Sequence, residues 1–260
     1  MASRLPRLIA PPAAAVRDTL AVTLPDGSDA SILRVRNPRA KRIKLSVDER
    51  GARLTLPMRA SLAAGDQFLQ QHLPWLAQQL LHYAQPLQVE ALLPGQTASI
   101  PLRGQPCPVQ WRSGRYLKMD LEDDGLVIQL PPRLGATALQ RSLRGFYEAQ
   151  ARADIGRWLP RYLPELPRAP RQILFKVMSS QWGSLAPDGS MALDLSLVTA
   201  RPSAFEYVLV HELCHLIHAN HSPAYWAEVD RRFPDWREER QYFRDHGRQL
   251  KGSLRALLSA

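Results

Sequence analysis

The stretch "HELCHLIHANHS", from His211 to Ser222, places four of the chain's seven histidines within eleven residues. Two histidines four residues apart lie on one side of a helix, about 6 Å apart at Cβ, so one tetrahedral zinc ion can bind both imidazoles. Glu212 points roughly 100° away from His211 on such a helix, beside the metal rather than at it. The H-E-x-x-H pattern therefore predicts a metal site at which Glu212 is the general base.

The residues around the motif predict an amphipathic helix. Ser203 can cap its N-terminus, and Glu206, three residues later, can complete a capping box. Four apolar residues fall within an arc of roughly 80° on the helical wheel: Phe205, Leu209, Leu213 and Leu216. His211 and His215 lie on the opposite side, so we expect them to face a cleft or solvent.

The third metal ligand is predicted to be His221. His218 would lie about 10 Å along a continuing helix from His211, too far for one ion to bind both. Asn220 tolerates the left-handed conformation that ends helices, and Ser222-Pro223 is a cap followed by Pro at the first position of a new helix. The chain can therefore turn and return His221 to the ion, while His218 is expected beside the site or on the surface.

The predicted cofactor is Zn²⁺, held by His211, His215 and His221. Three imidazoles and one open position are typical of catalytic zinc, because structural sites close the fourth position with protein; a structural zinc is the alternative. A catalytic site also needs a group that stabilises the oxyanion. The sequence offers three candidates that it does not rank: Tyr225, Tyr242 and His246.

The composition is that of a globular protein, with 45% hydrophobic and 22% charged residues among 260. No uninterrupted apolar stretch of about 18 residues is present, so we expect no membrane span. Two cysteines, Cys107 and Cys214, cannot form a disulfide scaffold. They favour a reducing, cytoplasmic location, and both are expected to be buried. The sequence does not indicate an oligomeric state.

Much of the net charge of +10 is concentrated between Arg34 and Arg59, where nine Lys and Arg residues stand against two acidic ones, a balance of 9 − 2 = +7. In "KRIKLSV" and "ARLTL", apolar and polar residues alternate, which is the pattern of a half-buried strand. We therefore expect one basic sheet face. It is either a solvated surface or a site that binds phosphates of a nucleotide or nucleic acid.

The order of the predicted elements indicates an α+β fold. Strands are predicted early and helices late, without an internal repeat. Residues 1–19 are interpreted as a disordered lead-in rather than a signal peptide, residues 20–135 as a β-rich N-terminal region with antiparallel strands and some helices, and residues 136–260 as the catalytic region. A long helix is predicted from about Thr137 to Tyr162, and the strands "QILFKV" and "MALDLSLV" are predicted before the histidine-rich helix.

The segments "QWGSLAPDGSMALDLSLV", "HELCHLIHANHSPAYW" and "FPDWREERQYFRDHGRQL" resemble the YgjP-like zinc metallopeptidase family, and more distantly the SprT/Spartan proteases. The resemblance covers about residues 30–250 and implies a zincin-like helical catalytic half with a short β-hairpin before the H-E-x-x-H helix. It implies the same metal ligands and the same role for Glu212 as assigned above. The chain departs from the family pattern at Gln181, Leu185 and Asp194, where the family often has Arg, Cys and Asn.

The most direct functional expectation is a zinc metallopeptidase that acts on a peptide or protein. Two alternatives use the basic Arg34–Arg59 segment. The first is a metal-dependent nucleotide pyrophosphatase, in which the basic strands bind phosphates. The second is a SprT-like protease that acts on proteins held on nucleic acid, with binding that weakens steeply as salt increases.

Overall fold

The computed structural model describes residues 17–48, 51–84, 87 and 89–259, which form two compact units divided after Pro86. Residues 1–16 of the expected lead-in lie outside this range, and residues 17–19 belong to the first strand. The division between the units falls after Pro86, whereas the sequence analysis expects a boundary near residue 135. The second sheet shares a unit with the helix that carries the H-E-x-x-H motif because a continuous hydrophobic core joins them.

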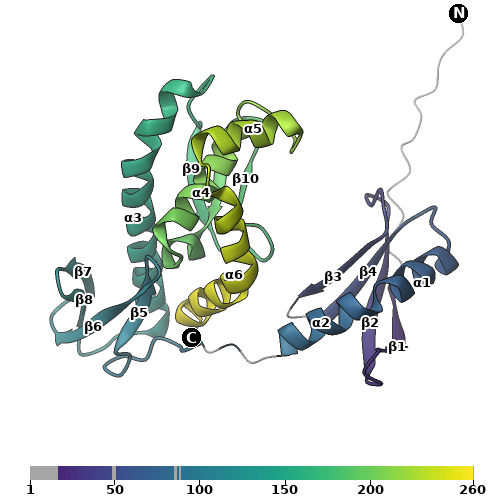
Figure 1. Ribbon diagram of the computed structural model, residues 1–260. Helices are drawn as coiled ribbons and strands as arrows, with labels where there is room; N and C mark the ends of the chain where they lie inside the picture. The colour runs from purple at the N-terminus through teal and green to yellow at the C-terminus, as the bar shows by residue number, and fades with distance from the viewer. Residues whose placement is uncertain (1–16, 49–50, 85–86, 88, 260) are drawn as a thin grey trace, which may run out of the picture. The chain divides into compact units, whose positions relative to one another are not determined.

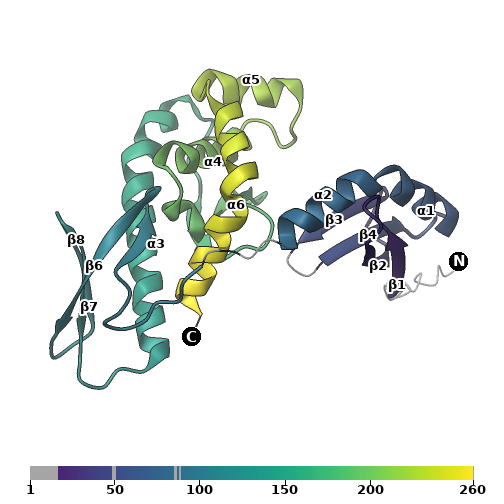
Figure 2. The same cartoon turned by 60° about the horizontal axis from the view of Figure 1, so that its bottom comes forward.

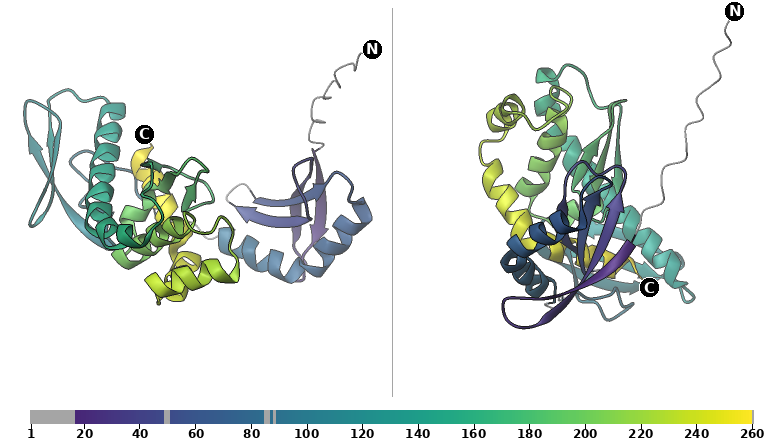
Figure 3. Two further views of the ribbon diagram at one scale, coloured as in Figure 1. Left: turned by 90° about the horizontal axis from the view of Figure 1, so that it is seen from above. Right: turned by 90° about the vertical axis from the view of Figure 1, so that its right-hand side faces the viewer.

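The first unit is a four-stranded sheet followed by two helices that cover one of its faces (Figure 3, left). The strand order is β1-β2-β4-β3. Two helices follow the sheet, and they are joined at His72, just before Pro74. The elements are β1 (Arg17–Thr23), β2 (Asp29–Asn37), β3 (Lys44–Asp48), β4 (Gly51–Pro57), α1 (Leu62–Gln71) and α2 (Leu73–Ala84).

The expected basic sheet face is only partly present in this unit. Leu54 and Leu56 of β4 are buried in the core under the helices, while Arg53 is exposed on the other face together with Lys44. Arg34 is in register with Leu54 and therefore lies on the helix side. It forms ion pairs with Asp18 on β1 and Asp66 on α1. The alternation in β3 and β4 is confirmed, but β2 places its arginines on the opposite face.

The second unit contains two sheets and the longer helices, and the predicted α+β class is confirmed. Each described sheet contains one parallel strand pair, which is β2–β4, β6–β8 or β9–β11. The expectation of antiparallel strands in the N-terminal region is therefore only partly met. The elements are β5 (Ser99–Leu102), β6 (Gln105–Ser113), β7 (Lys118–Glu122), β8 (Gly125–Leu130), α3 (Ala136–Tyr162), η1 (Leu163–Glu165), β9 (Gln172–Lys176), β10 (Gly183–Leu185), β11 (Ser190–Asp194), η2 (Leu195–Thr199), α4 (Pro202–Cys214), α5 (Pro223–Arg232) and α6 (Trp236–Leu258).

The first four strands of each unit have the same topology, which overturns the expectation of no internal repeat. The order β5-β6-β8-β7 reproduces β1-β2-β4-β3, with the same parallel pair and a helix after the last strand. The sequences also align without a gap, "KLSVDERGARLTLPMR" at residues 44–59 with "KMDLEDDGLVIQLPPR" at residues 118–133. The repeat is hard to see in the sequence because only the apolar alternation and a few positions are shared.

The core of the second unit lies between α3, the sheets and helices α4 and α6 (Figures 1 and 2). Helix α4 is central in this arrangement, and its residues are buried on most sides. Cys214 is buried as predicted, whereas Cys107 is partly exposed on β6. Among the described helices, none is long and apolar enough to cross a membrane.

Candidate metal centre

The metal-binding motif lies on α4, which begins earlier than the sequence predicts. Arg201 is the N-cap residue and Pro202 occupies the first turn, so Ser203 is not the cap and the predicted capping box is wrong. Proline is preorganised for the first helical position, which explains the earlier start. The Glu206 carboxylate instead accepts hydrogen bonds from Arg161 and Tyr162 at the end of α3.

Helix α4 also ends earlier than predicted. Three residues of the predicted apolar stripe, Phe205, Leu209 and Leu213, are buried, whereas Leu216 is partly buried. Leu216 also lies beyond the helix, which stops at Cys214 with His215 as its C-cap residue. His215 keeps right-handed helical dihedral angles, so it remains one turn from His211. Among the described residues other than glycine, only Arg103 has a positive φ, so Asn220 does not make the expected left-handed turn. The predicted cap of α5 is confirmed, because Ser222 accepts a hydrogen bond from the Tyr225 amide.

The structure brings together the three histidines that the sequence selects. One nitrogen of each of His211, His215 and His221 lies within 4.8 Å of the others. The Nε2 atoms of His211 and His221 are 3.1 Å apart. Zn–N bonds of about 2.0–2.1 Å in a tetrahedral site place ligand nitrogens about 3.3 Å apart, so this donor set fits zinc after small adjustments.

Neighbouring groups fix the orientation of these imidazoles. His215 Nδ1 lies 3.0 Å from the His218 carbonyl oxygen. A carbonyl can only accept, so Nδ1 carries the proton and Nε2 has a free lone pair for a metal. The Tyr225 hydroxyl donates to the His211 carbonyl at 2.9 Å, and its ring stacks on His215. His218 therefore supports the site through its backbone, beside the histidines that form it.

Glu212 is almost completely buried next to the histidines, with 4% of its surface exposed. This burial raises the pKa of its carboxyl group to about 8, because the charged form loses hydration. Within the described part of the chain, its buried Oε2 atom has no hydrogen-bond partner. A cation bound by the imidazoles would favour the charged carboxylate and lower this pKa again.

Glycine at position 183 leaves the space that Glu212 occupies. A Cβ atom at Gly183 would lie 2.5 Å from Glu212 Oε1 and 2.6 Å from its Cγ. Gly183 begins β10 and is the middle residue of Trp182-Gly183-Ser184, which we call the W-G-S loop. This loop therefore approaches the carboxylate closely. The sequence analysis selected this loop by resemblance but assigned no role to its glycine, because the contact joins residues far apart in the chain.

The side chains beside Gly183 anchor the loop to α6. The Trp182 indole stacks against Phe243, and Gly247 provides the surface on which it rests. The Lys251 ammonium lies 4.3 Å from the centre of that indole ring. It donates to the Gln181 carbonyl at 2.7 Å and forms a buried ion pair with Asp194 at 3.1 Å. Asp194, one of the departures from the family pattern, thus has a charged partner in this chain.

The histidines and Glu212 line a cleft of about 840 Å³ whose other walls come from the W-G-S loop, β10 and α6. None of the three predicted oxyanion stabilisers has a free group in this cleft. Tyr225 is fully buried with its hydroxyl on the His211 carbonyl. Tyr242 and His246 line a separate cavity of about 750 Å³. The cleft instead contains Tyr207 and Arg240, which the sequence analysis did not select.

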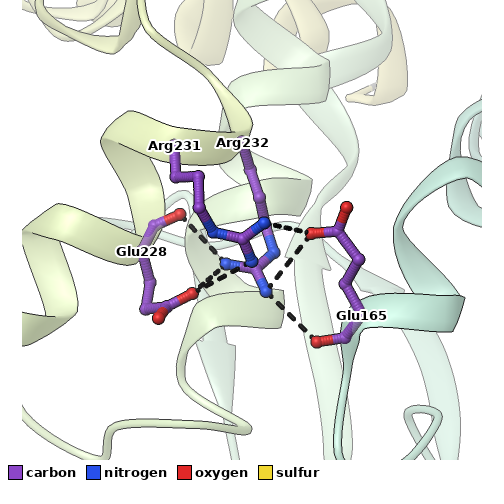
Figure 4. Close-up of polar contacts among 4 residues, drawn as sticks. All are labelled: Glu165, Glu228, Arg231 and Arg232. Carbon is purple, nitrogen blue, oxygen red and sulfur yellow. Dashed lines mark hydrogen bonds and ion pairs between the residues drawn. The ribbon is translucent and has the colours of Figure 1, made fainter.

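Ion pairs hold α5, which follows the turn at His221, against η1, the short helix that follows α3 (Figure 4). Arg231 on α5 donates to the Glu165 carboxylate at 2.7 Å. The Arg232 side chain, only 2% exposed, bonds to Glu228 and to the Glu165 carbonyl. The charges of Arg231 and Arg232 also suit the C-terminal end of this helix. Helix α5 therefore has a defined position next to the third histidine.

A cluster of three histidines and a buried glutamate thus lie together on one helix and the turn after it, and this donor set suits a divalent metal ion. The YgjP-like metallopeptidase domain matches residues 41–246, so the chain belongs to the YgjP-like family. This confirms the predicted family and supports a metal-dependent hydrolase at the family level. No curated protein and no solved structure is significantly similar to the chain.

Proposed function

We propose that the chain is a zinc-dependent peptidase in which His211, His215 and His221 hold the ion and Glu212 transfers protons. The observation that carries this proposal is the convergence of three imidazoles next to a buried carboxylate, inside an open cleft. A structural zinc site would be closed by a fourth protein ligand. Within the described chain, no further His, Cys, Asp or Glu joins the three-histidine cluster.

Zinc bound there would polarise the scissile carbonyl and lower the pKa of a coordinated water. Glu212 then accepts the proton of the attacking water and passes it to the leaving amine. A cation at the imidazoles would counter the effect of burial and keep the Glu212 carboxylate charged, so that it can accept the proton. The lack of a side chain at Gly183 leaves the space that this carboxylate occupies.

The edge of the small sheet supports a peptide as the substrate. Strand β10 lines the cleft, and among the described strands it pairs with β11 alone, so it lies at the edge of its sheet. Edge strands carry backbone N–H and C=O groups that an extended peptide can bind by β-augmentation. A peptide bound along Gly183–Leu185 passes the three histidines, because Gly183 touches Glu212 and all of these residues line one cleft.

The test combines metal analysis with hydrolysis of casein and a peptide mixture. The purified protein should contain about one zinc per chain, and His215→Ala should lose it. The Glu212→Gln variant should bind zinc like the parent yet hydrolyse peptides about 10²–10⁴-fold more slowly, because the amide cannot accept the proton. Full activity of a zinc-loaded Gln variant would assign the base to another group. Loss of zinc from that variant would show that Glu212 is a ligand.

A further inference from the structure

Three arginines line the cleft around the proposed zinc site: Arg168, Arg240 and Arg244. All three are exposed, and none of them forms an ion pair with a carboxylate in the part of the chain that the structure describes. Among the described lining residues, Glu212 is the only acidic one, and it is buried beside the histidines. The cleft wall therefore carries positive charge that no carboxylate of the described residues neutralises.

Two of these arginines occupy successive turns of α6. Arg240 and Arg244 are four residues apart, which places both guanidinium groups on the same side of the helix as Phe243, another lining residue. The Arg240 guanidinium lies 5.5 Å from the centre of the Trp226 ring. That ring in turn stacks on His221 at 5.7 Å. Arg240 is thus held one aromatic ring away from the proposed third ligand.

Arg168 lies elsewhere on the cleft wall, beside the β10–β11 turn, where it donates to the Pro187 carbonyl at 3.4 Å. A substrate lying along β10 therefore passes guanidinium groups that come from two separate parts of the fold.

We propose that this cleft selects peptides with an acidic side chain near the scissile bond, and that Arg240 and Arg244 bind its carboxylate. The proposal rests on the proposed peptidase function and names the substrate class. A guanidinium presents a planar pair of N–H donors that matches a carboxylate, and a second guanidinium one turn away adds a further charge-assisted bond. Hydrogen bonds to charged groups contribute enough to change relative rates about tenfold or more.

The experiment maps cleavage sites in a mixture of peptides from a digested proteome, followed by kinetics on one cleaved peptide and its Glu→Gln counterpart. We expect Asp or Glu to be enriched at one position near the cut. The parent should have a kcat/KM about tenfold higher for the Glu peptide. In the Arg240→Gln/Arg244→Gln double variant this ratio should approach one. Arg237→Gln is the matched control, because Arg237 lies on the same helix outside the cleft lining and pairs with Asp230.

Two kinetic outcomes would overturn the proposal. Equal rates for the Glu and Gln peptides in the parent would show that the cleft does not read the charge. An equal loss of kcat on both peptides in Arg240→Gln would place that guanidinium on the reacting carbonyl. Metal content and circular dichroism of each variant establish that it is folded and loaded.

A binding measurement separates this proposal from the peptidase proposal. The zinc-loaded Glu212→Gln protein is titrated into a labelled Glu peptide and a labelled Gln peptide, and anisotropy reports binding without cleavage. Tighter binding of the Glu peptide that is lost in the double arginine variant supports the proposal, even if the parent hydrolyses no peptide and the proposed function fails. Equal binding of the two peptides would overturn the proposal. It would also be overturned if the parent hydrolyses a nucleoside triphosphate and this nucleotide displaces the labelled Glu peptide at lower concentrations than unlabelled peptides do.

Discussion

His221 reaches the other imidazoles because the chain leaves the helix at His215 and re-enters a helix at Pro223. Its ring is stacked on Trp226, and its Nε2 atom points to that of His211. His218 lies in sequence between the proposed ligands His215 and His221, but it contributes only a backbone carbonyl that orients His215. His218 and His221 therefore have different expected roles, which substitutions can distinguish.

We expect His221→Ala to lower zinc affinity far more than His218→Ala. The first substitution removes a ligand, whereas the second keeps the carbonyl that supports His215. A titration against a chelator of known affinity measures both, and His82→Ala, in α2, is the control that should keep its zinc. The reverse order of the two effects would mean that the turn after α4 has been misassigned.

The Glu212 carboxyl group should make the stability of the metal-free protein depend on pH. Its folded pKa of about 8 lies above the ordinary value of 4.5. The stability linked to the neutral form is therefore complete below about pH 4.5 and is lost as the pH rises towards 8. Urea unfolding of chelator-treated protein should show this decline in the parent and a flatter profile in Glu212→Gln. Parallel profiles for the two proteins would contradict the burial argument.

At the scale of elements, α6 supports the site from outside it. Its residues Phe243, Gly247 and Lys251 hold the W-G-S loop, while Arg240 and Arg244 line the cleft. The Lys251–Asp194 pair joins this helix to the end of β11, and both side chains are buried. Asp194 also accepts from the Met178 and Ser196 amides. Helix, strand and loop thus meet at one ion pair.

Breaking the Lys251–Asp194 pair from one side should destabilise the protein by about 3–5 kcal/mol, because the remaining charge stays buried without its partner. We expect this cost for Lys251→Met. Asp194→Asn in the same background should restore part of the stability, since no lone charge then remains. Chemical denaturation of the parent, both single variants and the double variant gives the coupling energy. Additive effects would show that the pair does not act as a unit.

At the scale of the whole molecule, the two units have separate cores. The core of the first unit is built around Ile32, Leu54 and Leu76, and that of the second around α3 and α4. The second unit contains the whole candidate metal site, which consists of His211, His215, His221, Glu212 and the residues that support them. The basic Arg34–Arg59 segment belongs wholly to the first.

We expect residues 87–260 to fold alone and to bind zinc with the stoichiometry of the full chain. All residues of the hydrophobic core of this unit and of its three-histidine cluster come from the second unit itself. Circular dichroism, thermal unfolding and metal analysis of the fragment and the full chain provide the comparison. A fragment that stays unfolded while the full chain is folded would show that the first unit is required for stability.

The sequence alone identified the three histidines, Glu212, the position of α3 and the alternation in β3 and β4, because these depend on spacing along one helix or strand. It also identified the cap of α5, where Ser222 and Pro223 act on their immediate neighbours. The predicted start of α4 was wrong because the sequence offers two local start signals, a capping residue at Ser203 and a proline at position 202, and the structure uses the proline. Local competition of this kind limits the precision of helix ends.

Only the tertiary structure decided which distant groups meet at the cleft. Gly183 faces Glu212, and Lys251 pairs with Asp194. Arg240 packs on Trp226, whose ring stacks on His221, the proposed third ligand. Each contact joins elements separated by many residues, so it depends on how helices and sheets pack rather than on a repeat along the chain. Packing likewise placed Tyr242 and His246 in another cavity, although their sequence positions are close to Arg240 and Arg244.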